Sequence, residues 1–219
     1  MRVCLASTSP ARLALLRQSG IEPLCLSPDV DEDAVAAAEA DRLGRKLAPE
    51  EVVLLLGRAK AADVAARIHD THPGFEGIVI GGDSMFELDG EVHGKPHTPE
   101  RALARWHAMR GRTGALHSGH SVILVRPGAP AEEAHAVAEA AVTFAADIDD
   151  AELERYIATG EPLLVAGAFT VDSLGGAFIE RVDGDPSTVV GMSLSTLRHL
   201  AGRLGIRWTD LWNAVPPSS

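Results

Sequence analysis

The 219-residue sequence has few cysteines and few lysines. Its two cysteines, Cys4 and Cys25, lie in apolar, strand-like surroundings, which favours small buried side chains over a disulfide or a nucleophile. Only three lysines occur, Lys46, Lys60 and Lys95, so arginine supplies most of the positive charge. No Cys/His cluster has the spacing of a zinc site. A disulfide-rich fold and a zinc module are therefore excluded.

Long hydrophobic runs are also missing. No stretch approaches the roughly 18 uninterrupted apolar residues that a membrane helix needs, and the run at residues 1–6 is too short for a signal peptide. We therefore expect a cytoplasmic protein with no membrane partner. With 46% hydrophobic residues, the chain can bury a substantial core in one large domain or two small lobes.

Positive charge is scarce overall, because the formal net charge is -11. Binding to a nucleic-acid backbone draws on clustered Lys and Arg, so this balance argues against a nucleic-acid partner. A small anion remains a possible ligand if a local basic cluster or a divalent metal overcomes the general negative field.

The hydrophobic pattern predicts a mixture of strands and helices. Strands are expected near residues 3–6, 21–27, 77–82, 85–88, 91–93, 118–125, 136–145 and 176–182. Helices are expected near residues 10–19, 49–67, 99–110, 150–159 and 194–204, whereas the Ala-rich segment after the acidic run at 29–33 is assigned no element. Because hairpins are included, we predict an α/β fold with a mixed sheet and flanking helices, in a single domain over residues 1–212. Residues 213–219 are expected to be a disordered tail.

A Ser/Thr-rich turn follows the first predicted strand. Ser7, Thr8 and Ser9 precede Pro10, which suits the first turn of a helix, and Arg12 lies two residues further along that turn. A strand that runs into a capped helix directs backbone N–H groups and the positive end of the helix dipole at one point, which suits a phosphate. Ser9 as a simple N-cap and Arg12 as a solvated residue explain the segment equally well, so both interpretations stay open.

Acidic residues at two places are candidates for metal or proton chemistry. Asp83 follows an apolar strand, and ligands of α/β sheets often bind at such strand ends, although a turn hydrogen bond is the alternative. Asp31 and Glu32, with Asp83, offer the hard oxygen ligands that Mg²⁺ or Mn²⁺ prefers, whereas an acidic run is also typical of a solvated loop. Lys95 leaves the following hairpin and is either solvated or folded back toward Asp83.

Eight motifs occur in the order seen in the Maf family, which the sequence resembles from Leu5 to about Leu204. They are Leu5-Ala6-Ser7-Thr8-Ser9-Pro10-x-Arg12-x-x-Leu15-Leu16, Asp31-Glu32, Ala59-Lys60-Ala61, Gly82-Asp83-Ser84, Gly94-Lys95-Pro96, Gly160-Glu161-Pro162, Ala166-Gly167-Ala168-Phe169 and Val190-Gly191-Met192-Ser193-Leu194. Any one motif is weak, but the ordered set is specific.

The resemblance implies a function. Members of the Maf family are nucleoside triphosphate pyrophosphatases, which convert a nucleoside triphosphate and water into the monophosphate and pyrophosphate. The resemblance also implies two lobes around a nucleotide cleft, as in inosine triphosphate pyrophosphatases, a homodimer, and a divalent cation (Mg²⁺, Mn²⁺ or Co²⁺).

The resemblance also suggests residue roles. Asp83 is similar to the family's proton acceptor and metal ligand, and Glu32 to its acidic metal ligand. Lys60 and Lys95 are expected to assist catalysis by neutralising charge on the phosphates. The expected substrate-binding set is Ser7, Ser9, Arg12, Lys60, Ser84, Lys95 and Asp172.

Two departures from the family pattern leave the substrate open. Many members carry two arginines after the Ser-Pro, whereas here Ala11 precedes Arg12. Asp172 stands where members acting on thymidine and uridine triphosphates commonly have Gln, and an ionised carboxylate accepts hydrogen bonds but donates none. Because these changes affect the expected cleft, a nucleotide-binding regulator of cell division with little catalysis is an alternative. The residues alone also allow a phosphatase that releases single phosphates.

Overall fold

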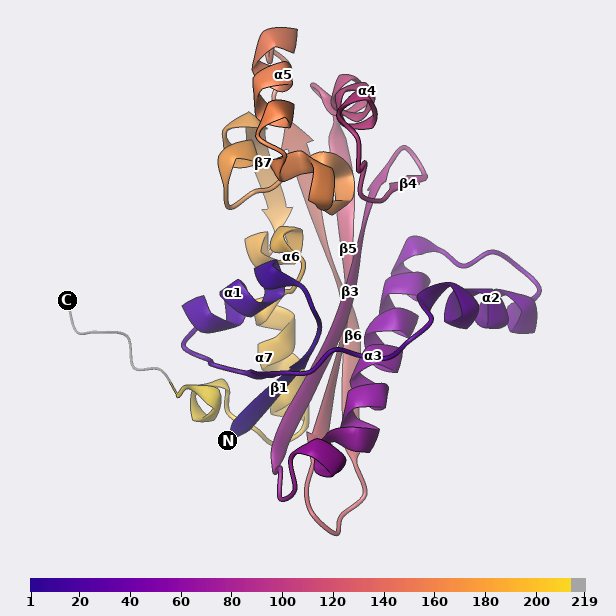
Figure 1. Cartoon of the computed structure of the whole chain (residues 1–219), viewed down its shortest axis with the longest axis vertical. Coiled ribbons are helices and arrows are strands. Elements are labelled where there is room, and N and C mark those ends of the chain that lie inside the picture. The colour runs from indigo at the N-terminus through magenta and orange to yellow at the C-terminus, as the bar shows by residue number, and fades with distance from the viewer. Residues whose placement is uncertain (214–219) are drawn as a thin grey trace, which may run out of the picture. The chain divides into compact units, whose positions relative to one another are not determined.

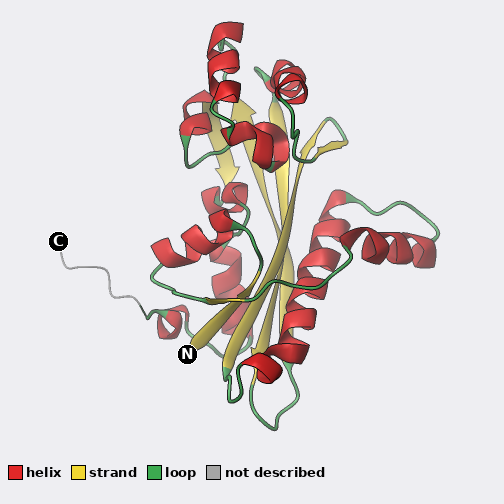
Figure 2. Ribbon diagram, in the orientation of Figure 1, coloured by secondary structure: helices red, strands yellow, loops and turns green. Residues whose placement is uncertain are grey.

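The computed structural model describes residues 1–213, and it confirms a mixed α/β fold (Figures 1 and 2). The strands are β1 (Arg2–Ala6), β2 (Leu24–Cys25), β3 (Gly77–Leu88), β4 (Glu91–His93), β5 (Thr113–Val125), β6 (Glu132–Phe144) and β7 (Ile179–Gly184). The α-helices are α1 (Pro10–Gln18), α2 (Glu32–Leu43), α3 (Pro49–Thr71), α4 (Pro99–Met109), α5 (Asp150–Ala158), α6 (Pro186–Val190) and α7 (Leu194–Arg203).

One mixed sheet contains all seven strands. Its order is β2-β1-β3-β5-β6-β7, and β4 pairs with β3 outside this path. Strand β1 is parallel to both β2 and β3, with Leu5 opposite Ile80, whereas the β3–β4 and β6–β7 pairs are antiparallel. Parallel pairing requires a long crossover, which helix α3 and its flanking segments provide between β1 and β3.

The chain divides into two compact units, each assembled from separate segments. Among the described residues, unit 1 consists of 1–83, 118–138 and 194–213, and unit 2 of 84–117 and 139–193. The long strands β3, β5 and β6 each contribute residues to both units. The expectation of one domain with two lobes around a cleft stays a prediction, and the expected tail lies, from residue 214 on, outside the described residues.

Unit 1 has an aliphatic core between α3 and the sheet. Ala61, Val64 and Ile68 of α3 are fully buried with Phe75 and with Val79 of β3. Cys4 belongs to this core, and burial raises the pKa of its thiol to about 12. Cys25 is exposed at the end of the two-residue strand β2, so the expectation that both cysteines are buried was wrong for Cys25.

Unit 2 has an aromatic core, although the chain is only 4% aromatic. It contains six of the nine aromatic residues, which are Phe86, Trp106, Phe144, Tyr156, Phe169 and Phe178. Most of the ring pairs are edge-on, for example Phe144 with Phe169 at a centroid separation of 4.9 Å. Such pairs contribute about 0.5–1.5 kcal/mol each beyond the area that they bury.

Several helices begin as the sequence predicted. Pro10 and Pro99 occupy the first turns of α1 and α4, and the Ser9 and Thr98 side chains accept hydrogen bonds from backbone N–H groups of those turns. No helix of the described residues is long and apolar enough to cross a membrane.

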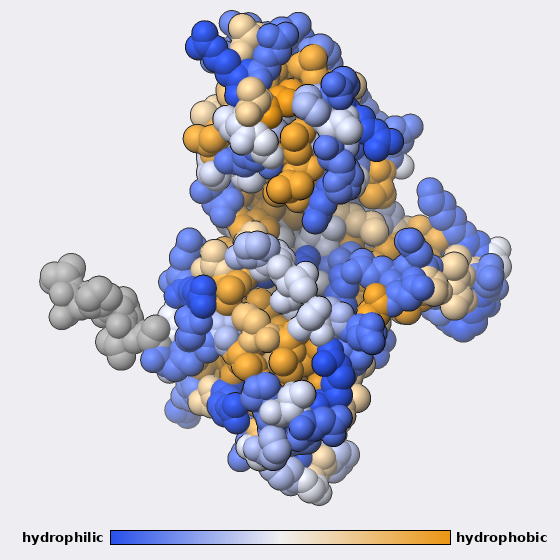
Figure 3. Space-filling model, in the orientation of Figure 1, coloured by the Kyte–Doolittle hydropathy of each residue, from blue (hydrophilic) through white to orange (hydrophobic). Residues whose placement is uncertain are grey.

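Helix α2 was not predicted. Asp31 caps its N-terminus by accepting from the Ala34 N–H at 3.0 Å, and Gly44 ends it in the left-handed conformation with φ of 66°. No residue of α2 is buried, and Figure 3 shows hydrophilic and moderately hydrophobic residues mixed over this helix. The periodic apolar face that would have indicated a helix is therefore absent.

Strand β3 is longer than predicted. The strand was predicted to end at Asp83, but pairing continues to Leu88, so Asp83 lies inside a twelve-residue strand. Gly81 is required there by close packing: a Cβ on it would lie 2.3 Å from the Gly57 carbonyl oxygen of α3.

Candidate active site

The turn between β1 and α1 holds Arg12 from two sides. The Ser7 hydroxyl accepts from the Ser9 N–H at 3.1 Å and from Arg12 Nη1 at 3.3 Å. The Ser9 hydroxyl caps α1 by accepting from the Arg12 N–H at 3.4 Å. Because Ser7 is buried, the hydroxyl-rich turn fixes both the backbone and the side chain of Arg12.

The Arg12 guanidinium is desolvated near acidic groups. Burial lowers its pKa, and the charges of Asp83 and Glu32 oppose that shift. A Cβ on Gly82 would lie 3.8 Å from Arg12 Nε, so this part of β3 runs directly beneath the side chain. Guanidinium groups bind phosphate through paired N–H donors, and Arg12 is pre-positioned to do so.

Lys60 joins two carboxylates in unit 1. Its ammonium lies 2.8 Å from Asp83 Oδ1 and 2.8 Å from Glu32 Oε1. The Lys60 and Asp83 side chains are 9% and 13% exposed, whereas Glu32 is half exposed at the start of α2. A buried ammonium requires carboxylate or other acceptor partners to offset its lost hydration. Because the Glu32 carboxylate is exposed, solvent and ligands can reach this side of the Lys60–Asp83–Glu32 group.

Three glycines bring Lys60 to this position. A Cβ on Gly119 of β5 would lie 2.1 Å from the Val53 carbonyl oxygen of α3, and one on Gly57 would lie 2.9 Å from the Gly119 oxygen. With Gly81 of β3, these residues let the α3 backbone approach the sheet directly. The roles of Gly57 and Gly119 were not predicted, because nothing in a single sequence distinguishes a glycine needed for close approach from one in a turn.

The carboxylates of unit 1 suit a divalent cation. Mg²⁺ is typically bound by one or two carboxylates, with substrate phosphates and water completing the shell, and Glu32 and Asp83 provide two carboxylates around one ammonium. Among the described residues, no group of three or more His, Cys, Asp or Glu residues is placed to hold a metal. The donor set therefore fits a cation that arrives with phosphate oxygens and not one held by protein ligands alone.

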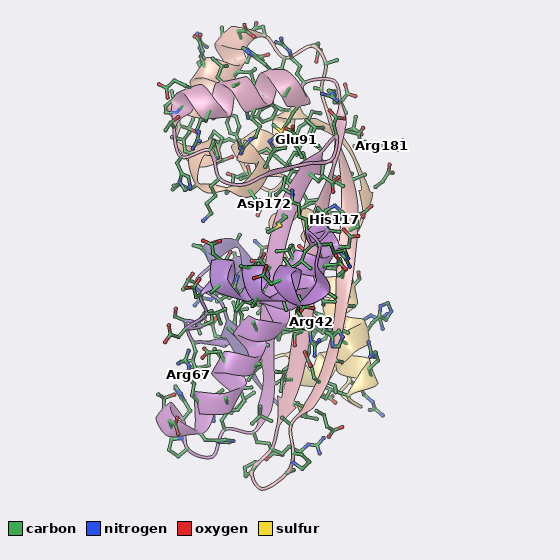
Figure 4. The ribbon with its side chains drawn as sticks, turned by 90° about the vertical axis from the view of Figure 1, so that its right-hand side faces the viewer. Arg42, Arg67, Glu91, His117, Asp172 and Arg181 are labelled. Carbon is green, nitrogen blue, oxygen red and sulfur yellow. The ribbon has the colours of Figure 1, made fainter. Side chains whose placement is uncertain are left out.

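The other predicted site residues belong to unit 2. Ser84 follows Asp83 on β3, and its hydroxyl donates to the Gly191 carbonyl oxygen at 3.1 Å. Lys95 is exposed after β4. Asp172, labelled in Figure 4, is exposed in the loop before β7. The structure thus gathers Ser7, Ser9, Arg12, Glu32, Lys60 and Asp83 in unit 1, and the other three residues in unit 2.

Glu161 organises the loop that carries Asp172. Its carboxylate accepts from the Ser173 hydroxyl at 2.7 Å, the Gly175 N–H at 3.0 Å and the Tyr156 hydroxyl at 3.0 Å, and also from the Thr170 hydroxyl. Burial alone raises the pKa of Glu161, but these hydrogen bonds lower it to about 2. From the sequence, Gly160-Glu161-Pro162 was recognised only as a family motif, and the hydroxyl residues Thr170 and Ser173 that follow were the available signal for this role.

A family model for Maf-like proteins matches residues 2–204. The chain belongs to the Maf-like family. The match includes every site residue named above, from Ser7 to Gly191. The recognition made from the ordered motifs is therefore confirmed.

Curated relatives of this Maf-like chain carry one functional name. A protein from Leifsonia xyli subsp. xyli named nucleoside triphosphate pyrophosphatase is 60% identical over 97% of each chain. One from Rhodococcus jostii with the same name is 50% identical, covering 95% of this chain and 94% of the relative. Among solved structures, the Staphylococcus aureus Ham1 protein is 12% identical with a TM-score of 0.34, covering 67% of this chain and 73% of the other. A likeness at that score bears on neither fold nor function.

Proposed function

We propose that this Maf-like protein is a nucleoside triphosphate pyrophosphatase that hydrolyses a nucleoside triphosphate to the monophosphate and pyrophosphate. The names of relatives at 50–60% identity over nearly the full chain support this activity. The observation in this molecule that carries it is the group formed by Lys60, Asp83 and Glu32, with Arg12 beside it. The relatives' name does not favour the alternative of a nucleotide-binding regulator of cell division.

Asp83 is proposed as the proton acceptor. Attack of water at the α-phosphorus requires a base that orients the water and takes its proton, and Asp83 is the most buried carboxylate of the group. Its Oδ1 is held by Lys60 at 2.8 Å, which leaves Oδ2 for the water. Lys60 thereby positions the base, and its charge adds to that of Arg12.

The cationic side chains are proposed to stabilise the phosphates. Negative charge grows on pyrophosphate as it leaves, and fixed positive groups stabilise that charge without reorganising. Arg12 supplies a desolvated guanidinium, and Lys60 a buried ammonium. Lys95 is proposed for the same task from unit 2, and the Ser9 and Ser84 hydroxyls as further phosphate contacts.

A divalent cation, Mg²⁺, Mn²⁺ or Co²⁺, is proposed as the cofactor. Glu32 and Asp83 would hold it, and when bound it would neutralise phosphate charge during hydrolysis. Glu32 is suited to this role because its side chain is half exposed and can leave Lys60 at little cost.

Asp172 is proposed to contact the nucleotide base. Its exposed carboxylate offers acceptors only, so it would favour a base edge that presents N–H donors. A homodimer and a cytoplasmic location are further parts of the proposal. The homodimer rests on the family resemblance, and the cytoplasmic location rests on the lack of long hydrophobic runs in the sequence.

The proposed activity is tested by product identification. Purified protein should convert at least one canonical or modified nucleoside triphosphate, with Mg²⁺, Mn²⁺ or Co²⁺, into monophosphate and pyrophosphate in equal amounts. Chromatography of the nucleotides and a coupled pyrophosphate assay measure both products. Release of single phosphates would contradict cleavage at the α-phosphorus, and no product from any nucleotide would contradict the enzyme function.

A further inference from the structure

Unit 2 contains a cavity of about 430 Å³ between the segment after β4 and helix α4. Four of its lining side chains are basic: His93, Lys95, Arg101 and Arg105. Two alanines of α4 and one proline complete the lining, and no acidic residue of the described chain is part of it. In a sequence with 31 acidic residues against 20 lysines and arginines, a cavity whose ionisable lining residues are all basic is unexpected.

One face of helix α4 forms this wall. Arg101 and Arg105 are four residues apart, so they lie on the same side of the helix, about 5–6 Å apart at their Cβ atoms. A different face of α4 buries Ala102, Trp106 and Met109 in the aromatic core. The helix is therefore fixed by its apolar face, and the two guanidinium groups are presented on a rigid support.

Arg105 is held in place and is not a freely solvated side chain. It is half-buried, and its Nη1 donates to the carbonyl oxygen of Gly94, next to Lys95. Burial lowers the pKa of Arg105, and the charge of Arg101 lowers it further. Burial also lowers the pKa of His93, and the positive charge of Arg105 lowers it further, whereas the negative charge of Glu91 raises it. These positive groups repel one another, and an anion would relieve that repulsion.

We propose that this cavity binds a diphosphate group, with Arg101 and Arg105 as its principal ligands and Lys95 and His93 beside them. Guanidinium forks match phosphate oxygens in pairs, and two forks one helical turn apart match two linked phosphates better than one. No Phe, Tyr or Trp side chain lines the cavity among the described residues, and the imidazole ring of His93 lies against Phe86 with a centroid separation of 6.2 Å. The cavity therefore offers little surface on which a nucleotide base would stack. The ligand is recognised by its phosphates.

Two ligands could supply the diphosphate: free pyrophosphate, and the terminal phosphates of a nucleoside triphosphate. The choice of these two ligands rests on the proposed function, but their binding can be measured without hydrolysis. Isothermal titration with inorganic pyrophosphate in the presence of EDTA, which removes divalent cations, measures the site directly. A non-hydrolysable nucleoside triphosphate analogue and a nucleoside monophosphate are titrated in parallel.

We expect pyrophosphate to bind, and Arg101→Gln and Arg105→Gln each to weaken binding about tenfold or more. Arg155→Gln is the matched control, because it removes the same charge from an exposed position on helix α5 of unit 2. Thermal unfolding of each variant shows whether the fold is retained, and Arg105→Lys provides a milder change that keeps the charge but loses the fork.

The outcomes separate the two sources. Arginine-dependent binding of free pyrophosphate assigns the site to the product, and arginine-dependent binding of the triphosphate analogue alone assigns it to the substrate. The proposal is overturned if neither ligand binds, if Arg155→Gln weakens binding equally, or if binding depends on Arg12 and is insensitive to Arg101 and Arg105. A failed hydrolysis screen with intact pyrophosphate binding would instead reject the proposed function and leave this site standing.

Discussion

At the scale of single residues, Asp83 and Lys60 illustrate how a buried charge is kept in a chain with few lysines. Lys60 contacts two carboxylates at the same distance, so if one carboxylate is removed, the other still balances the charge of the Lys60 ammonium. A substitution at Asp83 can therefore remove its chemical role without leaving Lys60 unpaired.

Replacing Asp83 by Asn should lower kcat on the order of 100-fold or more, because the amide cannot accept the proton of the attacking water. Folding should survive, since Lys60 keeps its contact with Glu32. Steady-state kinetics and thermal unfolding measure the two effects. Asp70→Asn is the control, an exposed carboxylate on α3 that makes the same chemical change. Turnover equal to that of the unmodified protein would remove Asp83 from the role of base.

At the scale of elements, the contact of helix α3 with strands β3 and β5 positions Lys60. Gly57, Gly81 and Gly119 leave no space for a methyl group where the backbones meet. Because backbone atoms cannot move aside as a flexible side chain can, a substitution here displaces the whole helix.

Gly119→Ala should therefore destabilise the protein by about 3 kcal/mol and reduce activity, since α3 and Lys60 would shift together. Gly202→Ala is the control: Gly202 lies in helix α7 with open space around it, and alanine should stabilise that helix by roughly 0.5–1 kcal/mol. Urea unfolding measures both variants. If Gly119→Ala were as stable as the unmodified protein, the close approach of the α3 backbone to β5 would not be needed for stability.

The elements also show how far a single sequence can be interpreted. The Ser9 and Thr98 caps and the helices that follow were predictable because their signals are local. The continuation of β3 through Asp83 was not, because Gly81 serves a contact with α3 that lies far away in the sequence. Helix α2 was missed because it has no buried face. The family resemblance predicted that one site contains Asp83, Lys60 and Glu32. Only the structure gave the distances between them.

At the scale of the whole molecule, stability should depend on pH through Glu161. Its pKa is lowered to about 2 in the folded protein from an ordinary value near 4.5. A carboxylate with a lowered pKa contributes stability that is fully present above about pH 4.5 and is lost as the pH falls toward 2. The Glu161 contacts join helix α5 to the loop with Asp172, so this loss should affect unit 2 first.

Glu161→Gln should lower the free energy of unfolding by roughly 2 kcal/mol at pH 7, because the amide places a donor against hydroxyl and N–H donors. The difference from the unmodified protein should shrink between pH 4.5 and pH 2. Urea unfolding at pH 7 and pH 3 tests this, with exposed Glu154→Gln on α5 as the control. A difference that is the same at both pH values would contradict the role assigned to the Glu161 charge.

The interleaving of the two units constrains how the protein is made. Unit 1 consists of three stretches of chain, and the last begins at Leu194. Helix α7 of this stretch buries Leu197, Leu200 and Ala201. A ribosome must therefore synthesise nearly the whole polypeptide before unit 1 has all its parts, whereas unit 2 is complete at Ser193. The segments that carry Arg12, Lys60 and Asp83 therefore cannot complete their unit until translation is almost finished. The N-terminal part of the chain is synthesised first, but the unit to which it belongs is the last to fold completely.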